Sequence, residues 1–170
     1  MSHGPRGYSP LQIGLHWVSA VLVIAAFVTH DAMIAAAKAA KDGTWSGYDP
    51  AMLVHVIGGI VVFFLALRRL RVPARRGAPD SPKDERPVPR LISRAVRVLL
   101  CAIVIVMPLS GVLNWFGGVA PARRLHLVME PVVPLAILLH MLGAFYQHFR
   151  VKNDVLARML RPTTKKGQAT

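Results

Sequence analysis

Four long stretches of this 170-residue sequence contain no Asp, Glu, Lys or Arg. They run from Gly7 to His30, from Pro50 to Leu67, from Val98 to Ala122 and from Pro131 to Phe149. An α-helix rises about 1.5 Å per residue, so roughly 20 apolar residues cross the hydrocarbon core of a membrane. Long side chains that flank the two shorter stretches can extend those helices to the membrane surface. The pattern predicts an all-α integral membrane protein with four transmembrane helices.

The four helices are expected to form one bundle in a single domain over residues 1–170. Their expected bounds are about 11–30, 50–70, 92–115 and 125–149. A soluble bundle would need a polar stripe on each helix, and the range Val96 to Leu113 has almost none. The His16–Trp17 pair in the middle of the first stretch favours a retained helix over a cleaved signal. A short surface helix is expected over Asp31 to Lys41, ended by Gly43.

Positive charge is confined to particular segments of the chain. The sequence holds 21 Lys and Arg against 8 Asp and Glu, a formal net charge of +13. Arg6, the Arg68 to Arg97 connection and the tail from Arg150 together hold 17 bases and 4 acids, which is +13, and the rest of the chain holds 4 of each. By the positive-inside rule these segments and both termini are cytoplasmic. The charge therefore indicates topology and argues against a nucleic-acid-binding protein. A solvated loop is expected over Val72 to Pro89.

Histidine is the main candidate for metal chemistry. The only cysteine, Cys101, excludes an intramolecular disulfide, a Cys-rich zinc site and a Cys-ligated iron–sulfur cluster. Ionisable residues inside a membrane are costly and need a reason to be there. The antiparallel order of the helices predicts two pairs at matched depths. His16 and His140 lie near the cytoplasmic end, and His55 and His126 lie near the outer end.

Two stacked bis-histidine sites are the arrangement that two b-type haems require. Two imidazoles leave no open coordination position on haem iron, which favours electron transfer over O₂ binding. Glycines that follow His55 and His140 by one turn, namely Gly58, Gly59 and Gly143, leave room beside the ligands for a flat macrocycle. The same glycines also suit close helix packing.

The other histidines are expected to have different roles. His3 lies near the terminus and His30 lies beside Asp31, so both are expected to be solvated. His148 is turned away from His140 and lies closer to the cytoplasm. In the fourth helix, His126 and His140 are fourteen residues apart, within about 40° of one face and about 21 Å apart along the axis. Pro131 and Pro134 predict a kink between them.

Several motifs resemble the bacterial cytochrome b561 family. They are Tyr8-Ser9-Pro10-Leu11-Gln12 with Leu15-His16-Trp17, His55-Val56-Ile57-Gly58-Gly59, Met107-Pro108-Leu109-Ser110-Gly111, Leu139-His140, Gln147-His148-Phe149 and the tail Asn153 to Leu160. In relatives the outer histidine of the fourth helix is usually followed by Glu and an uninterrupted helix, which differs from this sequence. The resemblance implies a multi-pass protein of the bacterial inner membrane with two b haems, bound by His16, His55, His126 and His140.

Size and layout are similar to the superoxide oxidase type of this family. That similarity implies that electrons pass from superoxide outside to ubiquinone near the cytoplasmic side, with the haems supplying the redox chemistry. Four bases are candidates for attracting superoxide: Lys38, Lys41, Arg123 and Arg124. Five residues are candidate quinone donors: Gln12, Arg68, Arg71, His148 and Arg150. The alternative is a haem-bearing membrane anchor that exchanges electrons with a partner dehydrogenase or another periplasmic redox protein; the short outer connections favour the first hypothesis.

Overall fold

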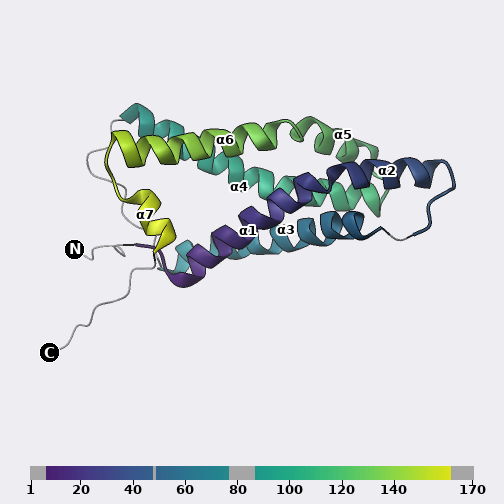
Figure 1. Ribbon diagram of the computed structural model, residues 1–170, viewed down its shortest axis with the longest axis horizontal. Helices are drawn as coiled ribbons and strands as arrows, with labels where there is room; N and C mark the ends of the chain where they lie inside the picture. The colour runs from purple at the N-terminus through teal and green to yellow at the C-terminus, as the bar shows by residue number, and fades with distance from the viewer. Residues whose placement is uncertain (1–6, 48, 77–86, 162–170) are drawn as a thin grey trace.

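The computed structural model describes residues 7–47, 49–76 and 87–161, and their regular structure is entirely helical (Figure 1). The elements are α1 (Pro10–Val28), α2 (His30–Lys41), α3 (Pro50–Arg76), α4 (Pro87–Trp115), α5 (Ala120–Met129), α6 (Val132–Phe145), the π-helical turn η1 (Tyr146–Arg150) and α7 (Val155–Leu160). Four spans among the described residues are long and apolar enough to cross a membrane: Pro10–Val28, Pro50–Arg71, Leu91–Trp115 and Ala120–Arg150. The all-α fold with four such helices is therefore confirmed.

Apolar side chains cover the outside of the bundle. Val28 is 75% exposed, Phe149 71% and Phe64 63%. A small buried core of Ile103, Val133 and Ala136 lies between α4 and α6. An exposed apolar surface of this kind suits contact with lipid, where the helix satisfies its own backbone hydrogen bonds.

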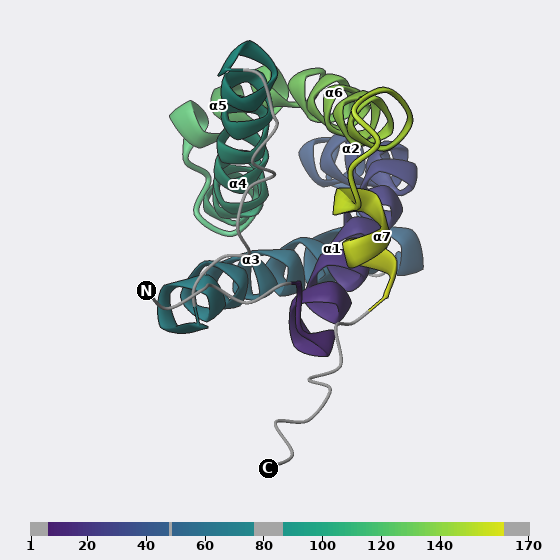
Figure 2. The same cartoon turned by 90° about the vertical axis from the view of Figure 1, so that its left-hand side faces the viewer.

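The helices form a bundle in which α1 packs on α3, α3 on α4, and α4 on both α5 and α6 (Figure 2). The start of α1, the end of α3, the start of α4 and η1 lie together at one end of the bundle, with α7 beside them (Figure 1). This end is called the basic end, because Arg68, Arg71, Arg97 and Arg150 lie in these segments. At the opposite end, α1 meets α2, and α3 and α5 begin. It is called the neutral end, because the part of the chain outside the basic segments holds four bases and four acids.

Local sequence explains how the first two helices begin and end. Ser9 and Gln12 form a capping box at the start of α1, with Pro10 at the first helical position. Thr29 separates α1 from α2 and donates through Oγ1 to the Ala25 carbonyl at 2.7 Å. Gly43, at φ +70°, follows the end of α2 in the left-handed conformation that glycine adopts without strain. The expected surface helix and its glycine stop are confirmed.

Helix ends differ from the sequence prediction where the chain becomes charged. α3 continues to Arg76 and α4 begins at Pro87, so the loop expected over Val72 to Pro89 is too long. α1 ends at Val28, and the fourth span begins at Ala120 instead of residue 125. For the other helices the reason is that the first charged residue marks the membrane boundary, whereas the helix itself continues past it; α1 instead ends before the first charge, at the Thr29 cap. The predictions for His3 and Arg6, and the middle of the expected loop over residues 77–86, lie outside the described ranges.

The fourth span is broken between α5 and α6, at Glu130 and Pro131. Proline has no N–H to bond to the preceding turn, so the predicted kink between His126 and His140 is confirmed. The small helix α7 was not predicted. The Trp17 Nε1–H group donates to the Met159 carbonyl at 3.0 Å, which ties α7 to α1.

Candidate functional site

At the basic end, the fold brings His16 of α1 and His140 of α6 together. Their ring centres are 6.2 Å apart and their planes are inclined at 57°. Both side chains are half-buried. This pair, the His16 pair, joins two helices far apart in the sequence, as the depth argument predicted.

At the neutral end, His55 of α3 and His126 of α5 line one cavity of about 370 Å³. This is the His55 pair. The His55 Nδ1–H group donates to the Ala26 carbonyl at 2.7 Å. The Nδ1–H group of His126 donates to the Met107 carbonyl at 3.0 Å and lies 3.1 Å from Ser110 Oγ. With Nδ1 engaged in each ring, Nε2 is the nitrogen available to a ligand in the cavity.

A third histidine, His30, also lines this cavity, which corrects the expectation that it is solvated. Its side chain is only 20% exposed, and its ring centre lies 6.2 Å from that of His55. Its Nε2 lies 3.4 Å from Glu130 Oε2, and its Nδ1 lies 3.8 Å from Asp31 Oδ1. The local sequence shows only the neighbouring Asp31. The tertiary fold, which brings the α5–α6 break onto the start of α2, places His30 inside.

Glycines lie beside both pairs. Gly59 lines the cavity of the His55 pair, and a Cβ on Gly143 would meet no atom within 4 Å. A Cβ on Gly58 would lie 4.0 Å from Leu22 of α1, which suits the helix-packing interpretation. Gly111, which was not predicted, faces His126 so closely that a Cβ there would lie 3.3 Å from the ring.

Three of the four bases predicted to attract an anion lie at the cavity of the His55 pair. Lys38 and Lys41 of α2 and Arg123 of α5 line it, and all three are exposed. Arg124 is also exposed but is not among the residues that line the cavity. The cavity therefore combines three imidazoles with a solvated positive rim.

The five candidate quinone donors are spread over the basic end. The Gln12 side chain is engaged in the cap of α1, and Arg68, Arg71 and Arg150 are exposed. His148 lies in η1 and is half-buried, and its Nδ1 is a buried atom with no hydrogen-bond partner among the described residues. A buried polar atom without a hydrogen bond is unfavourable, so His148 is the candidate that a hydrogen-bonding ligand would stabilise most.

Arg69, in the apolar span of α3, is the residue that the sequence interpretation missed. It is half-buried, and its Nη2 donates to His16 Nδ1 at 3.3 Å. A signal for it exists in the sequence, because Arg69 follows His55 by fourteen positions, as His140 follows His126. In the continuous helix α3, that spacing places His55 and Arg69 within about 40° of one helix face.

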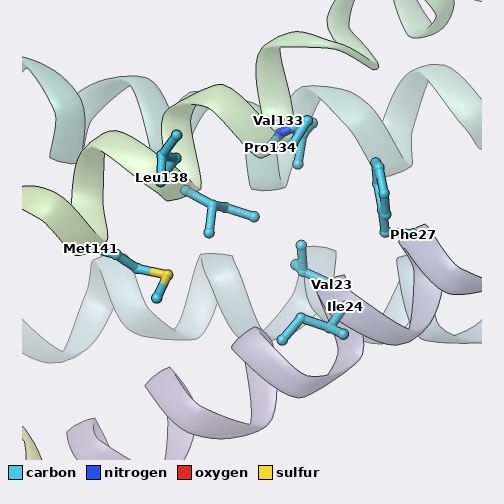
Figure 3. Close-up of a pocket in the computed structure, with 8 residues that line it drawn as sticks. Val23, Ile24, Phe27, Val133, Pro134, Leu138 and Met141 are labelled. Carbon is cyan, nitrogen blue, oxygen red and sulfur yellow. The ribbon is translucent and has the colours of Figure 1, made fainter.

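A second hollow, of about 210 Å³, separates α1 from α6 (Figure 3). Val23, Ile24 and Phe27 line it from α1, and Pro134, Leu138 and Met141 are among those that line it from α6. Its lining side chains are entirely apolar, and Met141 adjoins His140 in the sequence. The hollow suits a lipid or isoprenoid chain and has no group for redox chemistry.

The similarity to known proteins extends over nearly the whole chain. Residues 7–162 match the family described as prokaryotic cytochrome b561. The chain is 30% identical to "Cytochrome b562" of Cereibacter sphaeroides, over 92% of this chain and 96% of that protein. It is 26% identical to the "Probable superoxide oxidase CybB" of Yersinia pestis, over 91% of this chain and 96% of that protein.

Proposed function

The chain belongs to the prokaryotic cytochrome b561 family, and we propose that it carries electrons from superoxide at the neutral end to ubiquinone at the basic end. Membership makes it a multi-pass bacterial membrane protein of electron transport that binds haem b. The relative named as a superoxide oxidase supports the choice of donor. The observation that carries the proposal is the cavity at the neutral end, where His55 and His126 meet Lys38, Lys41 and Arg123.

Two haems, one at each histidine pair, fit the arrangement of the side chains. A haem would be held by two imidazoles that both reach the same iron ion. The ring centres of the His16 pair lie 6.2 Å apart, which leaves room for an iron ion between the two rings. At the His55 pair, the cavity and the engaged Nδ1 atoms leave Nε2 of both rings free to bind iron. When bound, haem b supplies a one-electron Fe(III)/Fe(II) couple at each pair.

His126 is a better partner for His55 than His30 is, although both line the cavity. Both His30 nitrogens face carboxylates, of Glu130 and Asp31. By contrast, Nδ1 of His126 points at a backbone carbonyl, the outer contact that typically orients a metal-bound imidazole. We therefore assign the ligands as His16 with His140 and His55 with His126.

The rim of the cavity suits capture of a small anion. Two superoxide anions each give up one electron and leave as O₂, and one ubiquinone takes up the two electrons with two protons to form ubiquinol. No proton is exchanged with superoxide, so the neutral end needs only to attract the anion and bring it near the His55 pair. Exposed Lys38, Lys41 and Arg123 supply the attracting field there.

Ubiquinone is proposed to bind near the basic end, with His148 as a donor to a quinone carbonyl. A π-helical turn such as η1 is frequent at functional sites. The buried Nδ1 atom of His148 gains a hydrogen bond if a quinone oxygen binds there. The apolar hollow between α1 and α6 offers a place for an isoprenoid chain (Figure 3).

The orientation follows from the charges. Arginines concentrate at the basic end, and the positive-inside rule assigns this end to the cytoplasm. The bundle then lies in the bacterial inner membrane with both termini cytoplasmic. The cavity of the His55 pair opens toward the periplasm, where superoxide is the proposed donor.

The purified, detergent-solubilised protein tests this function directly. Superoxide is added together with ubiquinone, and the b-type absorbance and ubiquinol are measured. We expect haem reduction and ubiquinol formation in the wild type and in Val54→Ala, a lipid-exposed neighbour of His55, and neither in His55→Ala. The function is wrong if superoxide leaves the haems oxidised. Reduction instead by a co-purifying protein would favour the membrane-anchor alternative.

A further inference from the structure

Arg69 is a charged side chain at an unusual place. It lies in the apolar span of α3 that runs from Pro50 to Arg71, and it is half-buried. Its Nη2 atom reaches His16 Nδ1 at 3.3 Å. Charged groups inside a membrane are expensive and mark a function by default. Because the guanidinium contacts the His16 pair, its function is expected to concern that pair.

His16 differs from the two histidines of the His55 pair in its partner at Nδ1. His55 and His126 each donate to a backbone carbonyl, of Ala26 and Met107. A carbonyl that accepts this hydrogen bond makes the imidazole a stronger electron donor to iron and so favours the oxidised metal. A guanidinium has no acceptor atom, so Arg69 cannot strengthen His16 in this way; once Nε2 of His16 binds iron, Nδ1 carries the ring proton and no longer accepts from Arg69, so the guanidinium acts on this pair through its charge.

The charge of Arg69 acts in the same direction. A cation in a low-dielectric surrounding stabilises an added electron nearby, because Coulomb interactions are weakly screened there. The bases that line the cavity of the His55 pair, Lys38, Lys41 and Arg123, are exposed and therefore screened by water and salt. Half-buried Glu130 adds a negative charge to that cavity's surroundings through its contact with His30.

We propose that Arg69 is a positioning and tuning residue that raises the reduction potential of the haem at the His16 pair above that of the haem at the His55 pair. This inference rests on the proposed function, specifically on its assignment of one haem to each pair. The consequence is that electron transfer from the neutral end to the basic end is downhill. Direction is then a property of the protein's own side chains and does not depend only on the supply of superoxide and quinone.

The test is a redox titration of the purified holoprotein, followed by its b-type absorbance, with haem content measured in parallel. Arg69→Gln removes the charge, Arg69→Lys keeps it, and Arg68→Gln removes the charge of the exposed neighbour. We expect Arg69→Gln to lower the higher of two potentials and to leave the lower one in place. Arg69→Lys and Arg68→Gln should keep both near their wild-type values.

The inference is overturned if Arg69→Gln retains both haems at unchanged potentials, or if Arg68→Gln produces the same shift. If Arg69→Gln loses a haem, Arg69→Lys decides: a retained higher potential supports the inference, and a lowered one overturns it. A wild-type protein with two haems of equal potential contradicts this inference alone. A wild-type protein with fewer than two haems contradicts the proposed function as well.

Discussion

The two ends of the bundle each bring two histidines together, in different surroundings. At the basic end, His16 and His140 meet across α1 and α6 with Arg69 against one ring. At the neutral end, His55 and His126 share a cavity with a third histidine, His30, which contacts the Glu130 carboxylate, and with a rim of exposed bases. The first pair lies beside a cation in the apolar span, and the second opens to water.

Under the proposed function, this difference lets one kind of site do two jobs. Ligand identity alone would make both haems alike, since each pair consists of two imidazoles. In the proposal, the nearby charges and the carbonyl partners of His55 and His126 distinguish the two haems, because these set how strongly each ring donates and how well an added electron is stabilised. The open cavity then suits electron entry from an anion, and the His16 pair suits delivery to a quinone in the membrane.

Removing a ligand from either pair should have the largest effect. His140→Ala and His55→Ala should each lose about one haem per chain, because one imidazole holds iron poorly without its partner. Quinone reduction by superoxide should be lost in both. Haem per chain, from the haemochrome spectrum, is the measurement. A variant that keeps its full haem content would remove that histidine from the ligand set.

The choice between His126 and His30 comes next. His126→Ala should lose the haem of the His55 pair, whereas His30→Ala should retain it, because both nitrogens of His30 face carboxylates. The same haem assay decides the question. The reverse result would make His30 the partner of His55.

His148→Ala should affect only the basic end. If His148 donates to a quinone carbonyl, its loss should raise the KM for ubiquinone about tenfold, the effect expected for one hydrogen bond. Haem reduction by superoxide should stay at the wild-type rate. Phe145→Leu, at an exposed neighbouring position, serves as the control. An unchanged KM in His148→Ala would exclude it as a quinone donor.

Arg123→Gln should slow the entry of electrons from superoxide at the neutral end. Removing one of three lining bases should reduce the rate constant for haem reduction by superoxide several-fold at low salt, and less at high salt, because salt screens an exposed charge. Arg124→Gln is the matched control, since Arg124 is exposed but does not line the cavity. Rapid-mixing absorbance at two ionic strengths provides the measurement. Equal slowing in both variants would show that superoxide is attracted by the summed charge of this end and not by the bases that line the cavity.

Gly111→Ala should produce the smallest effect, confined to the His55 pair. The added methyl group would lie 3.3 Å from the His126 ring, so the ring must shift by a few tenths of an ångström. A ligand whose orientation is disturbed in this way should bind haem less tightly, by up to about tenfold. Gly14→Ala, which places its methyl group in open space on α1, is the control. Indistinguishable haem retention in the two variants would show that His126 tolerates the displacement.

Much of the fold could be predicted because the membrane limits the alternatives. The charge-free stretches gave four spans, and Pro131 gave the break between α5 and α6. Helix ends were wrong because a charge such as Arg71 marks where lipid ends, while α3 continues to Arg76. α7 is short and has no strong pattern of its own, so its contact with Trp17 became visible only in the structure.

The candidate site was predictable in part for a related reason. Depth and helix direction suffice to predict that His16 and His140 lie at the same level. The structure places the two rings together. They do not show what surrounds a ring. His30 sits beside Asp31 in the sequence, yet the fold turns it toward His55 and Glu130. Arg69 stands among Arg68 and Arg71, and only its rotation about α3 separates it from those exposed neighbours.

The central claim is that two haems of unequal potential lie at opposite ends of the bundle. The most direct measurement is a redox titration of the wild type, His55→Ala and His140→Ala, followed by b-type absorbance. The wild type should show two components, with the higher-potential one surviving in His55→Ala and the lower-potential one in His140→Ala. A single component in the wild type, or survival in the opposite order, would contradict the account.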